Sequence, residues 1–317
     1  MSEKKPIIRC NPVFKQMVWG GTRLGSDFGY EIPGDSTGEC WGIAAHKNGD
    51  ATIETEEFKG ETLRSLWEKR RDLFGNLSGE VFPLLIKIID AKADLSIQVH
   101  PDDAYAAEHE DGSLGKMECW YIIDCPEDAE LVVGHNATTR EELADMIHNK
   151  KWDQFIRRIP IKKGDLIQID PGTVHAITSG CLLLETQQNS DITYRVYDYD
   201  RLVDGKLRQL HVEQSIDVIQ VPAKSVEDSK LHTQDLPKNQ WNELIACKYY
   251  RIFKLTLDGE IAFKQTHPFL NLSVIEGEGT CNGETVKKGD HLILPCGFGD
   301  VKMTGKMTVI ASTVNDK

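Results

Sequence analysis

The sequence predicts a mainly β fold, arranged as a sandwich or barrel rather than as alternating strands and helices. Short β-rich segments recur along the whole chain, and turn residues separate them. Few segments show the helical spacing of apolar residues. One pattern also occurs twice, in residues 164–172 and 289–297: a Gly-Asp pair, an apolar strand, then a turn that ends in Gly. Two related β-barrels in one chain are the economical interpretation of this repeat.

Length and charge narrow the function classes. The 317 residues suffice for about two domains. Lysine and arginine number 37 and acidic residues 50, so 37 − 50 gives a formal charge of −13. This balance argues against a nucleic-acid partner, which requires a basic face for the phosphates. A local cluster of Arg and Lys can still bind a small anionic substrate.

Neither a membrane nor an exported location is expected. Long uncharged apolar windows are missing from the sequence, and residues 1–12 carry no apolar run of signal-peptide length. We therefore expect a cytoplasmic protein. The eight cysteines form no CxxC pair, so reduced thiols are expected rather than a disulfide framework or a zinc ribbon.

We expect strands and two helices in the first 110 residues. The pattern of residues 1–60 indicates irregular strands and turns, and that of residues 60–70 indicates a helix. The apolar run 83–90 is typical of a buried strand. Residues 95–100 alternate as a second strand, and Pro101 is expected to open a short helix that continues to 108.

A helical insert interrupts the strands that follow. Residues 118–124 and 130–134 are β-rich, and Thr138 to Glu142 resembles a capping box that opens an insert at about 138–158. Strands return after the insert, and residues 211–220 predict a short helix.

The domain boundaries follow from a change in composition. Residues 223–245 are polar and irregular, so they are the predicted linker. We therefore expect an N-terminal domain at 1–222, which contains the helical insert, and a C-terminal domain of short strands and Gly-rich turns at 246–317.

One set of side chains has the composition of a catalytic metal site. Gln98 and His100 are two residues apart on a predicted strand, so they point to the same face. His175 follows a Pro-Gly turn, and Glu118 begins another strand. Two imidazoles and a carboxylate, with open positions for water or substrate, suit Zn²⁺, with Mn²⁺, Fe²⁺ and Co²⁺ as rivals. Each of these residues could equally be an ordinary core or surface side chain, because only folding can bring them together.

Two cations accompany this set. Residues 192–199 alternate, so Arg195 shares a strand face with Thr193. Facing inward, its guanidinium could bind a phosphate or stabilise an oxyanion; facing outward, it would pair with Asp191 or Asp198. Lys116 stands two residues before Glu118, and it either shares the face of that carboxylate or is solvated.

Several motifs together resemble the type I mannose-6-phosphate isomerase family. The resemblance rests on QVHPDD, GKMECWY, PGTVHAI and ITYRVYDYDR, and the glycines near Trp19 and Trp41 fit it as well. It covers most of residues 7–220 and continues more weakly to the end. At this length the chain resembles the short bacterial form, which lacks an additional helical domain. The motifs stand at 98–103, 115–121, 171–177 and 192–201.

The resemblance implies a fold of two cupin-type (jelly-roll) β-barrels with a few short helices. It implies one Zn²⁺ per chain, bound by His100, Glu118 and His175, with Gln98 at the position of a fourth ligand. It also implies that Arg195 is catalytic and that Lys116 lies in the active-site cleft. In the first repeat, His175 stands three residues after Gly172. In the second, Asp300 stands three residues after Gly297, so the C-terminal barrel is interpreted as lacking a metal.

The implied activity is the interconversion of D-mannose 6-phosphate and D-fructose 6-phosphate through a cis-enediol. A sugar phosphate is then the partner, protein partners stay open, and nucleic acid and membrane are not expected. The base remains unassigned among a metal-bound hydroxide, Lys116 and a carboxylate. Two alternatives remain: another metal-dependent cupin sugar isomerase or epimerase, and a non-catalytic cupin that binds sugar phosphates.

Overall fold

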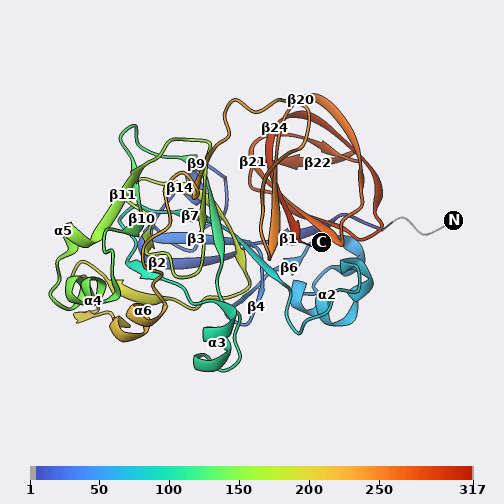
Figure 1. Ribbon diagram of the computed structural model, residues 1–317. Coiled ribbons are helices and arrows are strands. Elements are labelled where there is room, and N and C mark those ends of the chain that lie inside the picture. Colours follow the sequence, from blue (N-terminus) through green and yellow to red (C-terminus); the bar gives the residue numbers. More distant parts are fainter. Residues whose placement is uncertain (1–4, 316–317) are drawn as a thin grey trace.

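The computed structural model describes residues 5–315, so the outermost residues of both predicted terminal domains lie outside the description. Strands dominate the described chain, and the helices are short, which confirms the predicted mainly β class. Figure 1 shows two β bodies side by side, one coloured from blue to yellow and one in orange and red.

The first β body contains two antiparallel sheets. Strands in the middle of the larger sheet are covered on both faces, which explains the unbroken apolar run predicted at 83–90. The larger sheet has the order β18-β12-β9-β14-β7-β3-β2, with β2 Val13–Gly21, β3 Thr37–Ile43, β7 Leu84–Asp90, β9 Glu118–Asp124, β12 Asp165–Ile169, β14 Leu182–Gln188 and β18 Lys230–His232. The smaller sheet has the order β11-β10-β13-β8-β15, with β8 Ile97–Val99, β10 Glu130–His135, β11 Ile156–Pro160, β13 His175–Ala176 and β15 Tyr194–Tyr197.

The second β body is built on one sheet that includes two strands from the N-terminal segment. Its order is β19-β20-β24-β21-β23-β1-β6, and β22 pairs with β21. Blue β1 runs beside the orange and red strands in Figure 1 and pairs with β23, where Ile8 lies opposite Ile293. The strands are β1 Ile8–Asn11, β6 Thr52–Ile53, β19 Asn242–Ala246, β20 Tyr250–Gln265, β21 Phe269–Cys281, β22 Glu284–Lys287, β23 His291–Pro295 and β24 Gly299–Val314.

Short helices and hairpins connect these sheets. No helix among residues 5–315 is long and apolar enough to cross a membrane. The helices are α1 Arg23–Ser26, α2 Leu63–Lys69, α3 Asp103–His109, α4 Arg140–His148, α5 Trp152–Phe155 and α6 Val212–Val218, with 3₁₀ turns η1 Glu56–Phe58 and η2 Arg71–Phe74. Two small hairpins join β4 Ala45–His46 to β5 Gly49–Asp50, and β16 Leu202–Val203 to β17 Lys206–Leu207.

Side-chain caps set the starts of α3 and α4. The predicted capping box before α4 is confirmed: Thr139 Oγ1 accepts from the Glu142 N–H at 3.2 Å, and the Glu142 carboxylate accepts from the Thr138 N–H at 2.7 Å. The helix after Pro101 begins two residues later than predicted. Asp102 caps it instead, because its carboxylate accepts from the Tyr105 N–H at 2.9 Å.

The predicted repeat is present as the same turn in both β bodies. Gly164 and Gly289 have φ of 85° and 95°, a region that favours glycine. The aspartate after each glycine accepts from the backbone N–H of Lys162 or Lys287, at 3.0 and 2.9 Å. The similarity extends across the sheets, because β7, β14, β9 and β12 neighbour one another in the same order as β20, β24, β21 and β23. The sequence repeat therefore marks two related β architectures.

The predicted linker at 223–245 contributes to both sheets. It contains β18, which pairs with β12, and it includes most of β19, which pairs with β20. The domain bounds 1–222 and 246–317 remain a prediction, and the N-terminal strands β1 and β6 belong to the sheet of the second β body.

Candidate metal centre and substrate cavity

Three predicted ligands converge at one buried point. The ligand atoms of His100, Glu118 and His175 lie within 4.8 Å of one another. The two imidazole Nε2 atoms are 3.1 Å apart, and the Glu118 carboxylate oxygens lie 3.4 and 3.5 Å from them. All three side chains are buried. Folding thus brings together residues that are far apart in the sequence.

The register of the two sheets explains this convergence. Across the smaller sheet, Gln98 on β8 pairs with His175 on β13 on one side and with Arg195 on β15 on the other. Directly opposed residues in neighbouring strands have their side chains on the same face. Glu118 comes from the first position of β9 in the larger sheet. The centre therefore lies between the two sheets of the first β body.

Burial keeps both histidines neutral, which is the form that binds a metal. Burial, with the positive charge of Lys116 added, lowers the pKa of His100 well below its ordinary value. Burial also lowers the pKa of His175, to about 4. The His175 Nδ1–H donates to the Thr173 carbonyl at 2.8 Å, so Nε2 is the nitrogen left for a ligand.

Glu118 and its neighbours complete a donor set that fits a divalent ion. Burial and the negative charge of Glu185 raise the pKa of Glu118. One of its oxygens pairs with Lys116 at 2.9 Å, and the other, Oε1, accepts no hydrogen bond from the described residues. A cation would satisfy this buried carboxylate, since buried charges require a partner. Gln98 reaches the same point, with Nε2 3.3 Å from His175 Nε2, and a half-turn of its amide would present the oxygen instead. Nitrogen and oxygen donors of this kind bind divalent metals.

Lys116 contacts the centre from the cavity side. Its Nζ lies 2.9 Å from a Glu118 oxygen and 3.1 Å from His100 Nε2. The side chain is buried, which excludes the solvated orientation for Lys116. This ammonium is therefore the charged group next to the proposed ligands.

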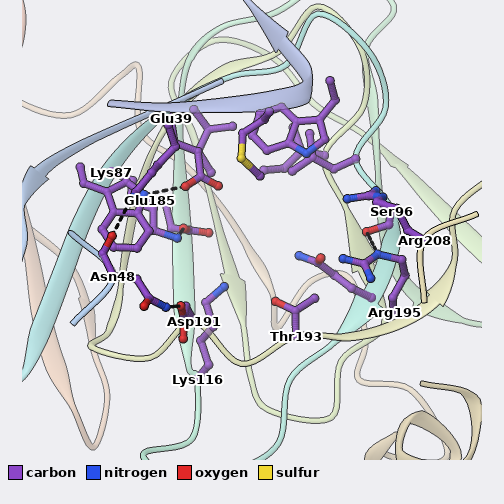
Figure 2. A pocket seen from close by; sticks show the side chains of 18 residues that line it. Glu39, Asn48, Lys87, Ser96, Lys116, Glu185, Asp191, Thr193, Arg195 and Arg208 are labelled. Atoms are coloured by element: carbon purple, nitrogen blue, oxygen red, sulfur yellow. Dashed lines mark hydrogen bonds and ion pairs between the residues drawn. The ribbon is translucent and has the colours of Figure 1, made fainter. Parts of the chain in front are cut away.

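A cavity of about 290 Å³ opens beside the centre. Gln98 and Lys116 form part of its wall, and Figure 2 shows it from close by. Its size and the charged side chains in its lining are suited to a small, hydrophilic molecule.

One wall of the cavity carries buried opposite charges that the sequence analysis did not single out. Lys87 Nζ lies 3.2 Å from a Glu185 oxygen, and the Trp120 indole N–H donates to the other Glu185 oxygen at 3.0 Å. Burial disfavours the ionised Glu185, but the positive charges of Lys87 and Lys116 outweigh it and lower the pKa of Glu185. Figure 2 shows both side chains on this wall with Glu39. Their signal in the sequence is a charged residue directly after an apolar run: Lys87 after LLI in LLIKIID, and Glu185 after LLL in CLLLETQQ.

Two arginines form the opposite wall. Arg195 lines the cavity, with Nε 3.3 Å from Ser96 Oγ and Nη1 donating to the Gln209 carbonyl at 2.8 Å. Burial and the positive charge of Arg208 lower the pKa of Arg195. Arg208, which the sequence analysis did not single out, lines the same wall in Figure 2. Asp198, one expected partner of Arg195, pairs with Arg208 instead.

The second β body has different residues at the corresponding positions. Ile169 on β12 pairs with Glu118, and its counterpart in the repeat, Leu294 on β23, pairs with Leu270. Following the register further, Ala311 corresponds to Glu185 and Phe253 to Lys87. Apolar side chains thus replace the charged ones at all three positions.

Two family models match the chain. The catalytic domain of type I phosphomannose isomerase matches residues 7–121, and the cupin domain of mannose-6-phosphate isomerase matches residues 241–314. The chain is 54% identical over 306 residues to mannose-6-phosphate isomerase ManA of Bacillus subtilis, covering 95% of this chain and 96% of ManA. It is 46% identical to the mannose-6-phosphate isomerase of Streptococcus mutans, covering 98% of this chain and 99% of that enzyme.

Solved structures show the same similarity. A crystal structure of mannose 6-phosphate isomerase from Bacillus subtilis aligns with a TM-score of 0.90 at 45% identity, covering 98% of this chain and all of that chain. A structure described as a putative mannosephosphate isomerase from Archaeoglobus fulgidus aligns with a TM-score of 0.81 at 18% identity over 99% of this chain and 100% of that chain. The second similarity concerns the fold alone.

Proposed function

The chain belongs to the type I mannose-6-phosphate isomerase family, and from this premise we propose how its own residues carry out the reaction. It is an enzyme that interconverts D-mannose 6-phosphate and D-fructose 6-phosphate. The observation that carries the residue assignments is one cavity with two charged walls, Lys87 with Glu185 (the Lys-Glu wall) and Arg195 with Arg208 (the arginine wall). It lies beside the buried His-Glu-His centre, which Gln98 and Lys116 of its lining contact.

We propose that the centre holds one Zn²⁺ per chain. His100, Glu118 and His175 are the proposed ligands, and Gln98 is the proposed fourth. The lack of a thiolate among the described donors at this point leaves Mn²⁺, Fe²⁺ and Co²⁺ as chemical rivals. When bound, the ion would supply positive charge that polarises the carbonyl and hydroxyl oxygens of the sugar.

The arginine wall is the proposed site of the substrate phosphate. Arg195 and Arg208 each use two of their three guanidinium nitrogens for contacts with described residues. Nη2 of Arg195 and Nη1 of Arg208 remain as donors beside the cavity. Guanidinium groups bind phosphate oxygens through such charge-assisted hydrogen bonds. Arg195 therefore acts by fixing the sugar phosphate, so that the reacting carbons face the opposite wall.

The Lys-Glu wall is the proposed site of proton transfer. Isomerisation moves a proton between C2 and C1, so a group that accepts and returns this proton must face the cavity. Glu185 lines the cavity, and the positive charges of Lys87 and Lys116 favour its ionised form, so we assign it this role among the carboxylates that the sequence left open. Lys116 can donate to the sugar oxygen on which negative charge develops in the cis-enediol step.

A coupled assay tests the metal part of this assignment. Fructose 6-phosphate formed from mannose 6-phosphate would be measured before chelation, after chelation and after Zn²⁺ is restored. We expect activity to disappear on chelation and to return with Zn²⁺. Full activity in protein shown by elemental analysis to be free of metal would overturn the metal assignment.

A cytoplasmic location is also part of the proposal. All eight cysteines are free thiols, and several are buried. Free thiols of this number persist in a reducing compartment. Fractionation of cells, with the activity measured in each fraction, would test the location.

A further inference from the structure

Asp198 and Arg208 close the base of a hairpin beside the cavity. Asp198 follows β15, Arg208 follows β17, and the β16–β17 hairpin lies between them. Arg208 Nε donates to one Asp198 oxygen at 2.7 Å, and Arg208 Nη2 donates to the other at 2.5 Å. The pair is therefore bidentate, which fixes the plane of the guanidinium as well as its position.

The pair leaves one face of Arg208 for the cavity. Asp198 is only 4% exposed, and both of its oxygens are occupied by Arg208. Asp198 is not among the residues that line the cavity, whereas Arg208 is. The carboxylate thus fixes two guanidinium nitrogens, and the third, Nη1, is available to a ligand in the cavity.

The charges on this wall show why such a partner is needed. Arg195 and Arg208 are close enough that the positive charge of Arg208 lowers the pKa of Arg195. Two like charges in a half-buried place repel, and a free Arg208 would move toward solvent. Asp198 offsets one of the two positive charges and keeps Arg208 beside Arg195. The two guanidinium groups then form a positively charged wall that can bind an anion.

We propose that Asp198 is a positioning residue that holds Arg208 in place for the phosphate of the substrate. The inference rests on the proposed function, because it takes the arginine wall as the phosphate site. Asp198 acts through Arg208 and does not itself touch the sugar phosphate. It matters for binding the anion and little for the proton transfer on the opposite wall.

Substitution Asp198→Asn separates positioning from simple electrostatics. The amide keeps the shape of the side chain, but its NH₂ group cannot accept from Arg208, so the bidentate pair is lost. Removing a negative charge near an anion site would by itself tighten phosphate binding, whereas loss of positioning weakens it. We expect the Ki of inorganic phosphate as a competitive inhibitor, and the KM for mannose 6-phosphate, to rise about 10-fold or more. We expect kcat to change by less than about 3-fold, since the proton-transfer wall is intact. An unchanged or lower Ki and KM would overturn the proposal.

Asp200→Asn is the matched control. Asp200 is exposed, lies on the same hairpin segment and undergoes the same change of charge. Its φ of 52° suits asparagine as well as aspartate, so the backbone is not strained. We expect its KM and Ki to equal those of the wild type. A rise as large as that of Asp198→Asn would mean that hairpin charge, not positioning, sets the affinity, and would also overturn the proposal.

A second variant covers the case in which Asp198→Asn does not fold. Arg208→Lys keeps the positive charge and can still pair with Asp198, but it lacks the fork that would hold the pair and a phosphate together. The same selective rise in KM and in Ki is expected, and an unchanged KM would contradict the proposal. Failure of the arginine-wall assignment is distinguishable, because substitution Arg195→Lys would then also leave the KM and the Ki of inorganic phosphate unchanged.

Discussion

Glu118 and Leu270 occupy the same position in two related sheets. Each pairs with the strand that follows the repeated Gly-Asp turn, Glu118 with Ile169 and Leu270 with Leu294. In the first β body this position carries a carboxylate of the candidate metal centre, and in the second it carries a buried leucine of the core. The same backbone pattern therefore supports a polar site in one body and apolar packing in the other.

This difference predicts one divalent ion per chain. Substitution His175→Ala should remove that ion and the isomerase activity and leave the fold intact, because His175 contributes an Nε2 donor at the centre. Elemental analysis would count the metal, and far-UV circular dichroism would report the fold. His148→Ala, at an exposed position on α4, is the control and should keep both metal and activity. A metal-free but active His175→Ala protein would contradict the assignment.

Substitution Glu185→Gln should lower kcat by about 10²- to 10⁴-fold, the usual contribution of a general base. The amide keeps the size of the side chain but cannot accept the proton. KM should change little, because the arginine wall is unaffected. Steady-state kinetics with both sugar phosphates would measure the effect, and Glu130→Gln, at an exposed position on β10, is the control. A kcat within 3-fold of wild type would remove Glu185 from the proton transfer.

The sequence predicted the features that have a local signal. The buried strand at 83–90, the capping box before α4 and the repeated turn each depend on residues close together in the chain, and the structure contains all three. Residue types and strand spacing singled out the candidate ligands, and the family motifs supported them. Their convergence was an expectation that only the sheet register could explain.

Other features had no local signal. β1 is a four-residue strand that pairs with β23, more than 280 positions away, and nothing near Ile8 specifies such a partner. Lys87 and Glu185 each follow an apolar run in the sequence, and their pairing follows only from the alignment of β7 with β14. The Asp198–Arg208 pair likewise needs the hairpin to bring its ends together.

The position of β1 predicts that Ile8→Ala destabilises the protein by about 2–5 kcal/mol. Ile8 is fully buried, and its side chain belongs to the apolar cluster that includes Ile293 and Phe269. Deleting most of that side chain leaves a cavity beside β1, where this strand pairs with β23. Urea unfolding followed by tryptophan fluorescence would measure the loss. Val18→Ala, at a half-exposed position on β2, should cost less than about 1 kcal/mol. Equal losses for the two variants would show that β1 contributes little to stability.

Because His291 is buried, we expect the protein to lose stability on acidification. It is 1% exposed, and its Nδ1 and Nε2 lie 2.9 Å from Ser273 Oγ and 3.2 Å from Tyr30 Oη. Burial lowers the pKa of His291 to about 4, although the charge of Asp290 opposes this effect. In the unfolded chain an ordinary histidine has a pKa of about 6.5, so the unfolded state binds the proton more tightly. The stabilisation from a neutral His291 is therefore complete above pH of about 6.5 and declines as the pH falls toward 4.

The size of this effect follows from the difference of roughly 2.5 in pKa, which corresponds to about 3 kcal/mol in total and about 2 kcal/mol between pH 7 and pH 5. Other buried histidines add to the wild-type slope, so the comparison is with His291→Gln, which cannot titrate. Between pH 7 and pH 5, we expect the free energy of unfolding of the wild type to fall by about 2 kcal/mol more than that of His291→Gln. Urea unfolding at both pH values would measure the two slopes, with His148→Gln, at an exposed position, as the control. If the free energy of unfolding of the wild type and of His291→Gln fell equally with pH, His291 would have no part in the acid sensitivity. The titration of this imidazole is the pH-dependent difference between the two proteins.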